Sequence, residues 1–182
     1  MQYGKIQPVC FNTFLLICYS IFLFSTYVSY ADASPSEDEE KYQRVLNMYS
    51  KYKEDFPEVR DIPAEDALLL MNNPKTVFVD VRKKKEQEIS TIPGAITQKQ
   101  FLADLDRYSQ MNIVAYCTIS YRSGKLAEKM AKKGVTIINL QAGLLGWVHA
   151  GGPLVDGNLQ VKKLHVYGKK WDLAPDGIHT IY

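Results

Sequence analysis

The chain has 182 residues and a net charge of +2, and 46% of its residues are hydrophobic and 12% aromatic. This length and composition fit one globular domain with appendages, and the small net charge gives no support for nucleic-acid binding, which requires a concentrated basic face. The three histidines, His149, His165 and His179, lack the spacing of metal ligands, so we expect neither a metal site nor a cofactor.

The first 33 residues differ from the rest of the chain. Residues 8–30 carry no charged side chain, and the sequence Ala31-Asp32-Ala33 that follows resembles a signal-peptidase cleavage site. Residues 1–33 are therefore predicted to be a secretory signal peptide, which would make the protein exported, either periplasmic or secreted. The apolar run is also long enough to span a bilayer, so the alternative is an uncleaved membrane anchor over residues 8–30. Contact with a membrane is expected only in that case.

Cleavage would leave a single thiol in the mature protein. Cys10 and Cys18 lie inside the apolar run, so only Cys117 remains after removal of residues 1–33. It could form no internal disulfide, although an exported compartment would permit one. A chemically working thiol is one explanation for its presence, and a buried inert cysteine is the alternative.

Residues 34–58 are interpreted as an acidic linker followed by a helix. The acidic stretch DASPSEDEE begins at Asp32, and a helix is predicted over residues 41–56 from apolar side chains at helical spacing. These side chains are Tyr42, Val45, Leu46, Tyr49 and Tyr52. The helix either packs on its own domain or forms an arm that binds a partner, and we favour packing.

Strand and helix patterns alternate through the middle of the chain. Strands are predicted at residues 76–81, 113–117 and 135–140, with a short one after the turn at 92–96. Helices are predicted at residues 65–71, 82–88, 98–106, 124–133 and 143–150. Alternation with short connections predicts an α/β fold built around a parallel sheet.

Cys117 is expected where a buried strand ends, directly before a loop that opens a helix. The backbone N–H groups of such a loop converge, the helix dipole adds partial positive charge, and Arg122 adds a full charge. A thiol in that position loses its proton more easily than a free cysteine, and the thiolate is the nucleophile. Ser123 is expected to be the N-cap or a first-turn residue of the helix, and Gly134 its C-terminal stop.

The alternation stops after Pro153. The turn signal Asp156-Gly157-Asn158 predicts a hairpin. Residues 155–182 are interpreted as a C-terminal extension packed on the domain. Trp171 is expected to pack there, and a role in gating substrate is the alternative.

Three blocks of the chain resemble the single-domain rhodaneses, a family of sulfurtransferases, over residues 59–154. The first is VFVDVRKKKEQEISTIPGA, which contains Asp80, Arg82 and Glu86; Ser90 and Thr91 stand where the family has Gly and His. The second is the loop from Cys117 to Ser123, with four residues between the cysteine and the arginine. The third is AGLLGW followed by GGP.

The resemblance implies a rhodanese-like parallel sheet flanked by helices in a single domain. It also implies a thiosulfate sulfurtransferase-like enzyme in which the Cys117 thiolate takes a sulfane sulfur from thiosulfate, a persulfide or a polysulfide. The resulting persulfide would pass the sulfur to cyanide or to a thiol, and a protein can also serve as the acceptor. No cofactor is implied.

The resemblance further assigns roles to loop and strand residues. The anion would be held by the loop residues Thr118, Ile119, Ser120, Tyr121 and Arg122. Arg122 would either contact an anionic donor or act structurally. Asp80, Arg82 and Glu86 are expected to brace the neighbouring loops, with Asp80 and Arg82 as a buried pair.

Two other functions stay open. One is a binding module without catalysis, in which Cys117 is vestigial or buried. The other is a phosphatase or arsenate reductase, but the related enzymes of that type have five residues between Cys and Arg to embrace a tetrahedral oxyanion, and this loop has four. The loop residues Thr118 to Tyr121 are also uncharged, which predicts that thiosulfate is a poorer donor than a persulfide or polysulfide.

Overall fold

A computed structural model of the chain describes Gly4 and residues 34–182. The predicted signal peptide, with Cys10 and Cys18, therefore lies outside the described residues except for Gly4. Among the described residues, no helix is both long enough and apolar enough to cross a membrane. Residues 35–182 form one unit of the chain.

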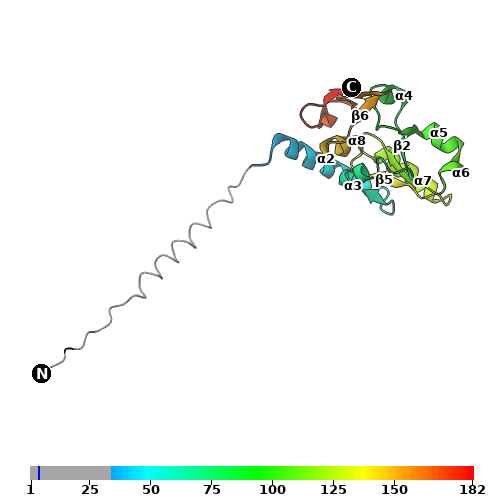
Figure 1. Cartoon of the computed structure of the whole chain (residues 1–182), viewed down its shortest axis with the longest axis horizontal. Helices are drawn as coiled ribbons and strands as arrows, with labels where there is room; N and C mark the ends of the chain where they lie inside the picture. Colours follow the sequence, from blue (N-terminus) through cyan, green and yellow to red (C-terminus); the bar gives the residue numbers. More distant parts are fainter. Residues whose placement is uncertain (1–3, 5–33) are drawn as a thin grey trace. The chain divides into compact units, whose positions relative to one another are not determined.

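A five-stranded sheet lies at the centre of this unit (Figure 1). Its strands are β1 (Asp61–Ile62), β2 (Thr76–Asp80), β3 (Ile96–Thr97), β4 (Asn112–Tyr116) and β5 (Ile138–Leu140). They run in the order β1-β5-β4-β2-β3, and every neighbouring pair is parallel. The predicted α/β fold with a parallel sheet is confirmed.

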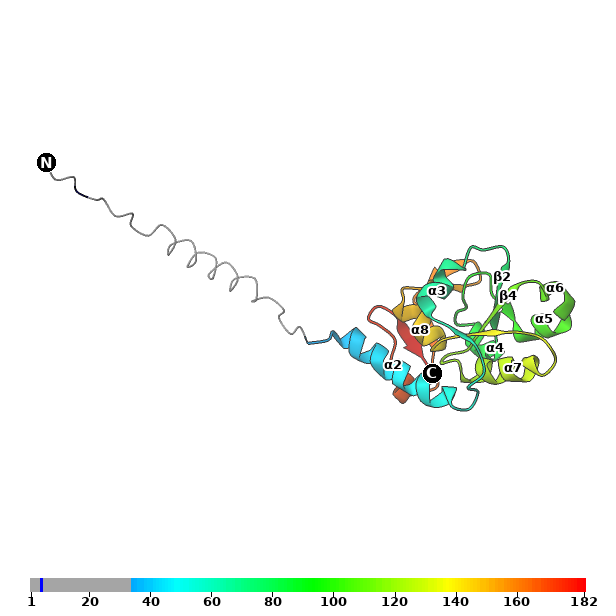
Figure 2. The same cartoon turned by 90° about the horizontal axis from the view of Figure 1, so that it is seen from below.

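Helices cover both faces of the sheet, as Figure 2 shows. α3 (Ala64–Leu69) and α8 (Gly143–His149) lie on one face; α5 (Gln98–Ala103), α6 (Leu105–Tyr108) and α7 (Tyr121–Ala131) lie on the other. A short helix, α4 (Lys84–Gln87), follows β2. Because both faces are covered, β4 is buried from Ile113 onward, which explains why it reads as a continuous apolar run.

The N-terminal helix α2 (Glu37–Lys53) packs on the domain through Val45 and Tyr49, which are both buried. It contacts α8 and α7. The Tyr49 hydroxyl donates to Asp61 at 2.7 Å and accepts from the side-chain amide of Asn139 at 2.9 Å. The helix thus joins the sheet edge by a buried polar network as well as by apolar contact.

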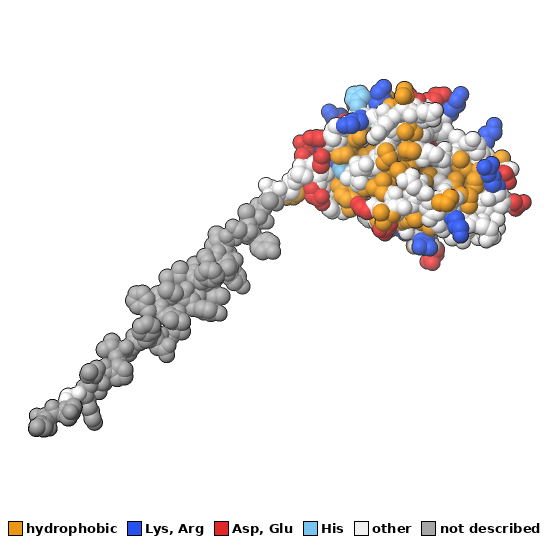
Figure 3. All heavy atoms as spheres, viewed as in Figure 1, with side chains coloured by type: hydrophobic (Ala, Val, Ile, Leu, Met, Phe, Trp, Pro, Cys, Tyr) orange, Lys and Arg blue, Asp and Glu red, His pale blue; other side chains and the backbone are white. Residues whose placement is uncertain are grey.

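Helix α2 begins at Glu37, four residues before the predicted start at Lys41. Ser36 caps it by accepting the Glu39 N–H at 3.2 Å. The acidic residues 37–40 occupy its first turn, where negative charge interacts favourably with the helix dipole. The last four residues of the stretch interpreted as an acidic linker are therefore helical, and their carboxylates contribute to the acidic group at one end of the unit in Figure 3.

The C-terminal residues form a hairpin and a second small sheet. The predicted hairpin consists of β6 (Leu154–Asp156) and β7 (Leu159–Val161), which are antiparallel. β8 (Lys163–His165) and β9 (His179–Ile181) then pair in parallel, with the 3₁₀ turn η1 (Lys169–Trp171) between them. Leu164, Val166 and Leu173 of this segment are buried in the hydrophobic core.

The helix α2 and the C-terminal segment also contact each other. The Lys41 ammonium lies 2.8 Å from the Asp176 carboxylate, and the Asp176 N–H donates to Asp38 at 2.9 Å. The ring of Tyr42 stacks on His149 with centroids 5.0 Å apart. His149 also forms a hydrogen bond of 2.7 Å with the Leu173 carbonyl, so it links α2 to the C-terminal segment. Segments that are 135 residues apart in the sequence therefore meet.

Candidate active site

Cys117 lies directly after β4, the central strand of the sheet, at the edge where the parallel strands end. It is a free cysteine and is only 2% exposed. The neighbouring strand β2 ends beside it, since Asp80 pairs with Tyr116 in the sheet register. The loop that follows strand β4 comprises residues 117–120.

The loop carbonyls are bound by the start of α8. The Leu144 N–H donates to the Cys117 carbonyl at 2.9 Å, and the Leu145 N–H donates to the Thr118 carbonyl at 3.1 Å. Gly143, with φ of +59°, permits this approach, because a Cβ there would come under 3.0 Å from the Cys117 carbonyl oxygen. The first amides of α8 thus fix the orientation of two loop peptides.

This orientation determines where the loop N–H groups point. In a trans peptide the N–H lies opposite the carbonyl, so the N–H groups of Thr118 and Ile119 are directed away from α8. Within residues 34–182, the N–H groups of Thr118, Ile119 and Ser120 donate to no other protein group. They are therefore available to an anion at the loop.

Helix α7 begins at Tyr121, earlier than predicted, and its N-cap is Ser120 in the left-handed conformation with φ of +65°. The Ser120 hydroxyl donates to the Leu140 carbonyl, which holds the residue in that conformation. The N-cap interpretation of Ser123 is therefore wrong, and Ser123 is a first-turn residue whose buried hydroxyl has no partner in the described part of the chain. The predicted stop at Gly134 is consistent with its φ of +79°.

Arg122 lies in the first turn of α7 and forms a two-pronged ion pair with Glu86 of α4. Its two terminal nitrogens donate to the two carboxylate oxygens at 2.9 and 2.8 Å. Burial alone raises the pKa of Glu86, but Arg122 and the Lys83 N–H outweigh burial and lower that pKa from 4.5 to about 2. Burial likewise opposes the charge of Arg122, and the bond to Glu86 raises the pKa of Arg122 overall.

The expected pair of Asp80 and Arg82 is present and fully buried. The Arg82 Nε and Nη2 atoms donate to the Asp80 carboxylate at 3.0 and 2.7 Å. Arg82 also donates to the Ser90 carbonyl, and its guanidinium lies 5.8 Å from the centre of the Tyr116 ring. The pair thereby links the end of β2 to the loop before β3 and to β4.

A pocket of about 360 Å³ opens at the loop. It is lined by Tyr52, Cys117, Thr118, Ile119, Tyr121, Arg122, Tyr167 and Trp171. Cys117 is thus almost fully buried and is at the same time one of the residues that line this cavity. Glu86 and Ser120 do not line it but hold lining elements, because Glu86 binds Arg122 and Ser120 is the N-cap of α7. Asp80 and Arg82 brace the end of the neighbouring strand β2.

A family model described as a rhodanese-like domain matches residues 63–150. The chain carries a rhodanese-like domain. The thiosulfate sulfurtransferase of Pseudomonas aeruginosa has a similar fold, with a TM-score of 0.51 and 21% identity over 63% of this chain and 23% of that one. A rhodanese-related protein of Thermoplasma volcanium gives a TM-score of 0.46 and 22% identity, and covers 53% of this chain and 98% of that chain.

Among curated proteins, the tRNA uridine(34) hydroxylase of Buchnera aphidicola is 31% identical over 98 residues. The similarity covers 48% of this chain and 30% of the hydroxylase. The chain therefore spans less than a third of the length of the curated relatives it matches. The resemblance expected over residues 59–154 covers nearly the same stretch as the rhodanese-like family model, which matches residues 63–150.

Three of the four aromatic side chains around the pocket lie outside the rhodanese-like domain. Tyr52 comes from α2, and Tyr167 and Trp171 come from the C-terminal segment, whereas Tyr121 belongs to the domain. Sequence reasoning favoured packing for Tyr52 and Trp171, with substrate gating by Trp171 as the alternative, and did not place Tyr167 near the thiol. Their local spacing gives no signal for this position, because chain segments far apart in sequence bring them together.

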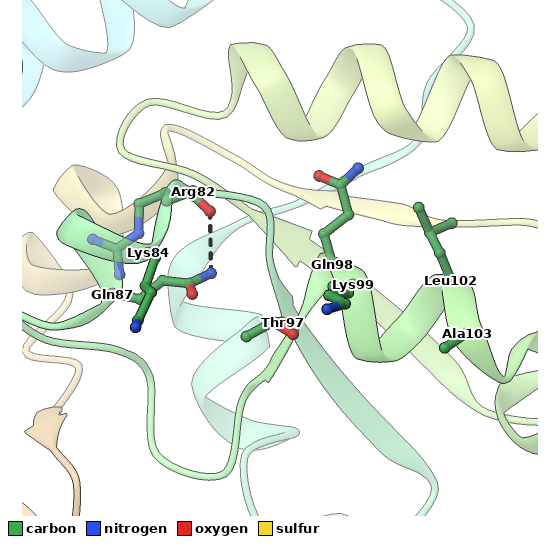
Figure 4. Close-up of a pocket in the computed structure, with 8 residues that line it drawn as sticks. All are labelled: Arg82, Lys84, Gln87, Thr97, Gln98, Lys99, Leu102 and Ala103. Atoms are coloured by element: carbon green, nitrogen blue, oxygen red, sulfur yellow. Dashed lines mark hydrogen bonds between the residues drawn. The ribbon is translucent and has the colours of Figure 1, made fainter.

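A larger pocket, of about 690 Å³, lies beside α4 and α5 and shares no residue with the Cys117 pocket (Figure 4). Its lining includes Gln87, whose side chain donates to the Arg82 carbonyl at 3.1 Å. In Figure 4 the Arg82 guanidinium points away from Gln98 and Leu102, so its charge is directed into the domain. In the described part of the chain, no group of three or more His, Cys, Asp and Glu side chains is arranged to hold a metal ion.

Proposed function

We propose that the protein is a sulfurtransferase that carries a sulfane sulfur as a persulfide on Cys117. The observation that carries the proposal is the position of this thiol, in a pocket and on a loop whose carbonyls are bound by α8 and whose N–H groups are free. The rhodanese-like domain around it supports the same activity. The donor would be a persulfide, a polysulfide or thiosulfate, and the acceptor a thiol or cyanide.

The reaction would proceed in two displacements at sulfur. The Cys117 thiolate attacks the outer sulfur of the donor, a new S–S bond forms, and the donor's own S–S bond breaks. The electron pair of that bond leaves on sulfite from thiosulfate, on a thiolate from a persulfide, or on a polysulfide anion that is one sulfur shorter. The acceptor, a thiolate or cyanide, then attacks the outer sulfur of the persulfide. That bond breaks, the acceptor leaves with the sulfur, and Cys117 returns as a thiolate.

The loop N–H groups would stabilise the anion in both displacements. The N–H groups of Thr118, Ile119 and Ser120 donate to no other group of the described residues, and the start of α7 adds partial positive charge. Arg122 is held by Glu86 through both terminal nitrogens, which favours a bracing role over contact with an anionic donor. Asp80, Arg82 and Glu86 would act as supports of the loop.

The test is sulfur loading of the full chain. After incubation with polysulfide and, separately, with thiosulfate, we expect the Cys117 peptide to gain one sulfur atom by mass, and Cys117→Ser to abolish that gain. Peptide mapping separates Cys117 from Cys10 and Cys18. If no sulfane donor adds sulfur to the Cys117 peptide, the proposal fails.

A binding module without catalysis is the second candidate, and the 2% exposure of Cys117 favours it. Titration with a small thiol reagent at mildly acidic pH separates the two functions. An activated thiolate reacts quickly under these conditions, whereas a buried inert cysteine reacts only after the protein is unfolded.

We further propose that the protein is exported. The apolar residues 8–30 and the Ala31-Asp32-Ala33 sequence support this proposal. N-terminal sequencing of the protein from its native cells tests it: a start near residue 34 supports cleavage and export, and an intact N-terminus in the membrane fraction supports the anchor.

A further inference from the structure

The aromatic collar around the pocket consists of Tyr52, Tyr121, Tyr167 and Trp171. Tyr52 and Trp171 stack with nearly parallel rings whose centres are 6.0 Å apart. Tyr52 also meets Tyr121 at 5.2 Å, and Tyr167 meets Trp171 at 6.0 Å. The rings therefore contact one another in a chain and form a connected apolar wall beside Cys117.

The charge inside the collar is compensated. In the described part of the chain, Arg122 is the charged residue that lines the pocket, and Glu86 binds both of its terminal nitrogens. The guanidinium also lies 5.0 Å from the centre of the Tyr167 ring, and the Tyr167 hydroxyl donates to Glu86 at 3.3 Å. The Lys170 ammonium lies 5.6 Å from the Trp171 ring. A small dianion in the pocket would lose water without gaining a free cation beside the thiol.

The size of the pocket also fits an organic group. A volume of about 360 Å³ lies at the lower end of small-molecule sites, which are mostly apolar with a few polar groups. Aromatic walls stabilise a flat apolar ligand through offset or edge contacts. The collar is therefore better suited to an organic substituent than to inorganic sulfur anions.

We propose that the acceptor of the Cys117 sulfur is a low-molecular-weight thiol with an uncharged aromatic group that binds in the collar. This inference rests on the proposed sulfurtransferase function. The acceptor thiolate attacks the outer sulfur of the Cys117 persulfide, forms a bond to it, and leaves as an aromatic persulfide. The electron pair of the broken S–S bond returns to Cys117, so no oxidant or reductant is needed.

The first experiment measures discharge of polysulfide-loaded full chain by three thiols. Benzyl mercaptan is neutral and aromatic, 4-(mercaptomethyl)benzoate is its anionic counterpart, and 2-mercaptoethanol is neutral and small. Each rate constant is divided by the rate of the same thiol with glutathione persulfide. We expect benzyl mercaptan to exceed the other two by about fivefold or more. Equal normalised rates would overturn the inference.

Variants locate the preference in the collar. Trp171→Ala should lower the ratio of the benzyl mercaptan rate to the cyanide rate by about fivefold, because cyanide is too small to depend on aromatic contact in the collar. Tyr182→Ala is the matched control, since it removes an aromatic side chain of the same segment that is 68% exposed. A preference that survives in Trp171→Ala, or that is lost equally in Tyr182→Ala, contradicts the collar as its source.

A binding measurement distinguishes failure of this inference from failure of sulfur transfer. In a Cys117→Ser chain no transfer can occur, and benzyl methyl sulfide serves as an unreactive analogue. We expect it to quench Trp171 fluorescence saturably, with Trp171→Phe in the same background giving the signal of Trp147 alone. Absence of saturable quenching overturns the inference, even if cyanide discharges the Cys117 persulfide of the unmutated chain. Saturable quenching without sulfur loading of the unmutated chain supports the collar's preference and rejects the sulfurtransferase function.

Discussion

At the scale of single residues, two arginine–carboxylate pairs hold the candidate site together. The Asp80–Arg82 pair is wholly buried, whereas in the Glu86–Arg122 pair the carboxylate is buried and the arginine side chain is 28% exposed. Removing one member of such a pair leaves the other without its partner in a poorly solvated place. The Glu86–Arg122 pair is the more informative of the two, because it joins α7, the helix that follows the Cys117 loop, to α4.

Glu86→Gln should make the free energy of unfolding less dependent on pH. The pKa of Glu86 is lowered from 4.5 to about 2, so its charge stabilises the fold fully above pH 4.5, and this contribution is lost as pH falls from 4.5 toward 2. This lowering of the Glu86 pKa corresponds to about 3 kcal/mol in the free energy of unfolding. We expect Glu86→Gln to cost about this much at pH 7 and progressively less below pH 4.5, measured by urea unfolding.

Glu88→Gln is the control for that experiment. Glu88 lies 3.5 Å from Lys84 on the exposed side of α4, and its side chain is 60% exposed. Surface pairs of this kind contribute less than about 1 kcal/mol, so this variant should behave like the unmutated protein at each pH. A Glu86→Gln cost that stays constant from pH 7 to pH 3 would contradict the lowered pKa.

Gly143→Ala tests the support of the loop by α8. Gly143 and Gly157 have nearly equal positive φ values, +59° and +58°, but a Cβ at Gly143 meets the Cys117 carbonyl, while one at Gly157 meets no atom within 4 Å. Both changes should cost about 1 kcal/mol for the backbone conformation. Gly143→Ala should cost about 1–3 kcal/mol more and should slow sulfur loading of Cys117. Equal effects of the two variants on stability and loading would show that the contact with α8 is unimportant.

One of two departures from the family pattern has a structural explanation at this scale. The Ser90 hydroxyl donates to the Lys163 carbonyl at 2.6 Å. The Thr91 backbone exchanges two hydrogen bonds with Val155, at 2.8 and 2.9 Å. Both residues therefore attach the C-terminal segment. Only the Ser90 bond depends on the side chain, so the structure explains Ser in place of Gly and does not explain Thr91 in place of His.

At the scale of elements, α7 approaches the turn after α2 through Gly124. A Cβ at Gly124 would come under 3.0 Å from ring atoms of Phe56, and the Phe56 side chain is fully buried. The glycine inside α7 therefore has a packing reason: it allows the helix that positions Arg122 to lie close against the N-terminal segment.

Gly124→Ala has two opposing effects on stability, a gain in helix propensity and a loss of packing against Phe56. Alanine is favoured over glycine inside a helix by about 1 kcal/mol, but displacement of a buried ring costs about 1–3 kcal/mol. We expect net destabilisation by about 1 kcal/mol in the unmutated chain, measured by urea unfolding. In a Phe56→Leu background, where the ring is absent, the same substitution should become neutral or stabilising. Destabilisation of equal size in both backgrounds would exclude Phe56 as the cause.

At the scale of the whole molecule, the segments outside the rhodanese-like domain are part of the core and of the pocket. Leu164 and Val166 are completely buried, and Leu173 is nearly so. The same segment carries Tyr167 and Trp171 to Cys117. Its stability is therefore coupled to the shape of the candidate site.

Leu164→Ala should destabilise the protein by about 2–5 kcal/mol, because it leaves a cavity in the core. Leu159→Ala is the matched control: this leucine lies in the same C-terminal region but is 74% exposed, so its loss should change stability by less than about 0.5 kcal/mol. Urea unfolding of both variants measures the difference. If the two costs were alike, the C-terminal segment would not be part of the cooperative fold.

The sequence by itself determined the parallel α/β fold and the place of Cys117 at a strand end before a helix. It also predicted the Asp80–Arg82 pair, whose members are two residues apart. These features follow from periodicity, turn residues and short-range spacing, which are properties of contiguous segments.

Only the tertiary structure decided how distant segments meet at the thiol. The partner of Arg122 is Glu86, 36 residues earlier, and the loop carbonyls are bound by α8, which follows more than 20 residues later. The left-handed Ser120 and the early start of α7 depend on such contacts. The aromatic collar joins Tyr52 to Trp171 across most of the chain. Local patterns cannot specify these arrangements, because the same apolar or charged residue satisfies many possible partners until packing selects one.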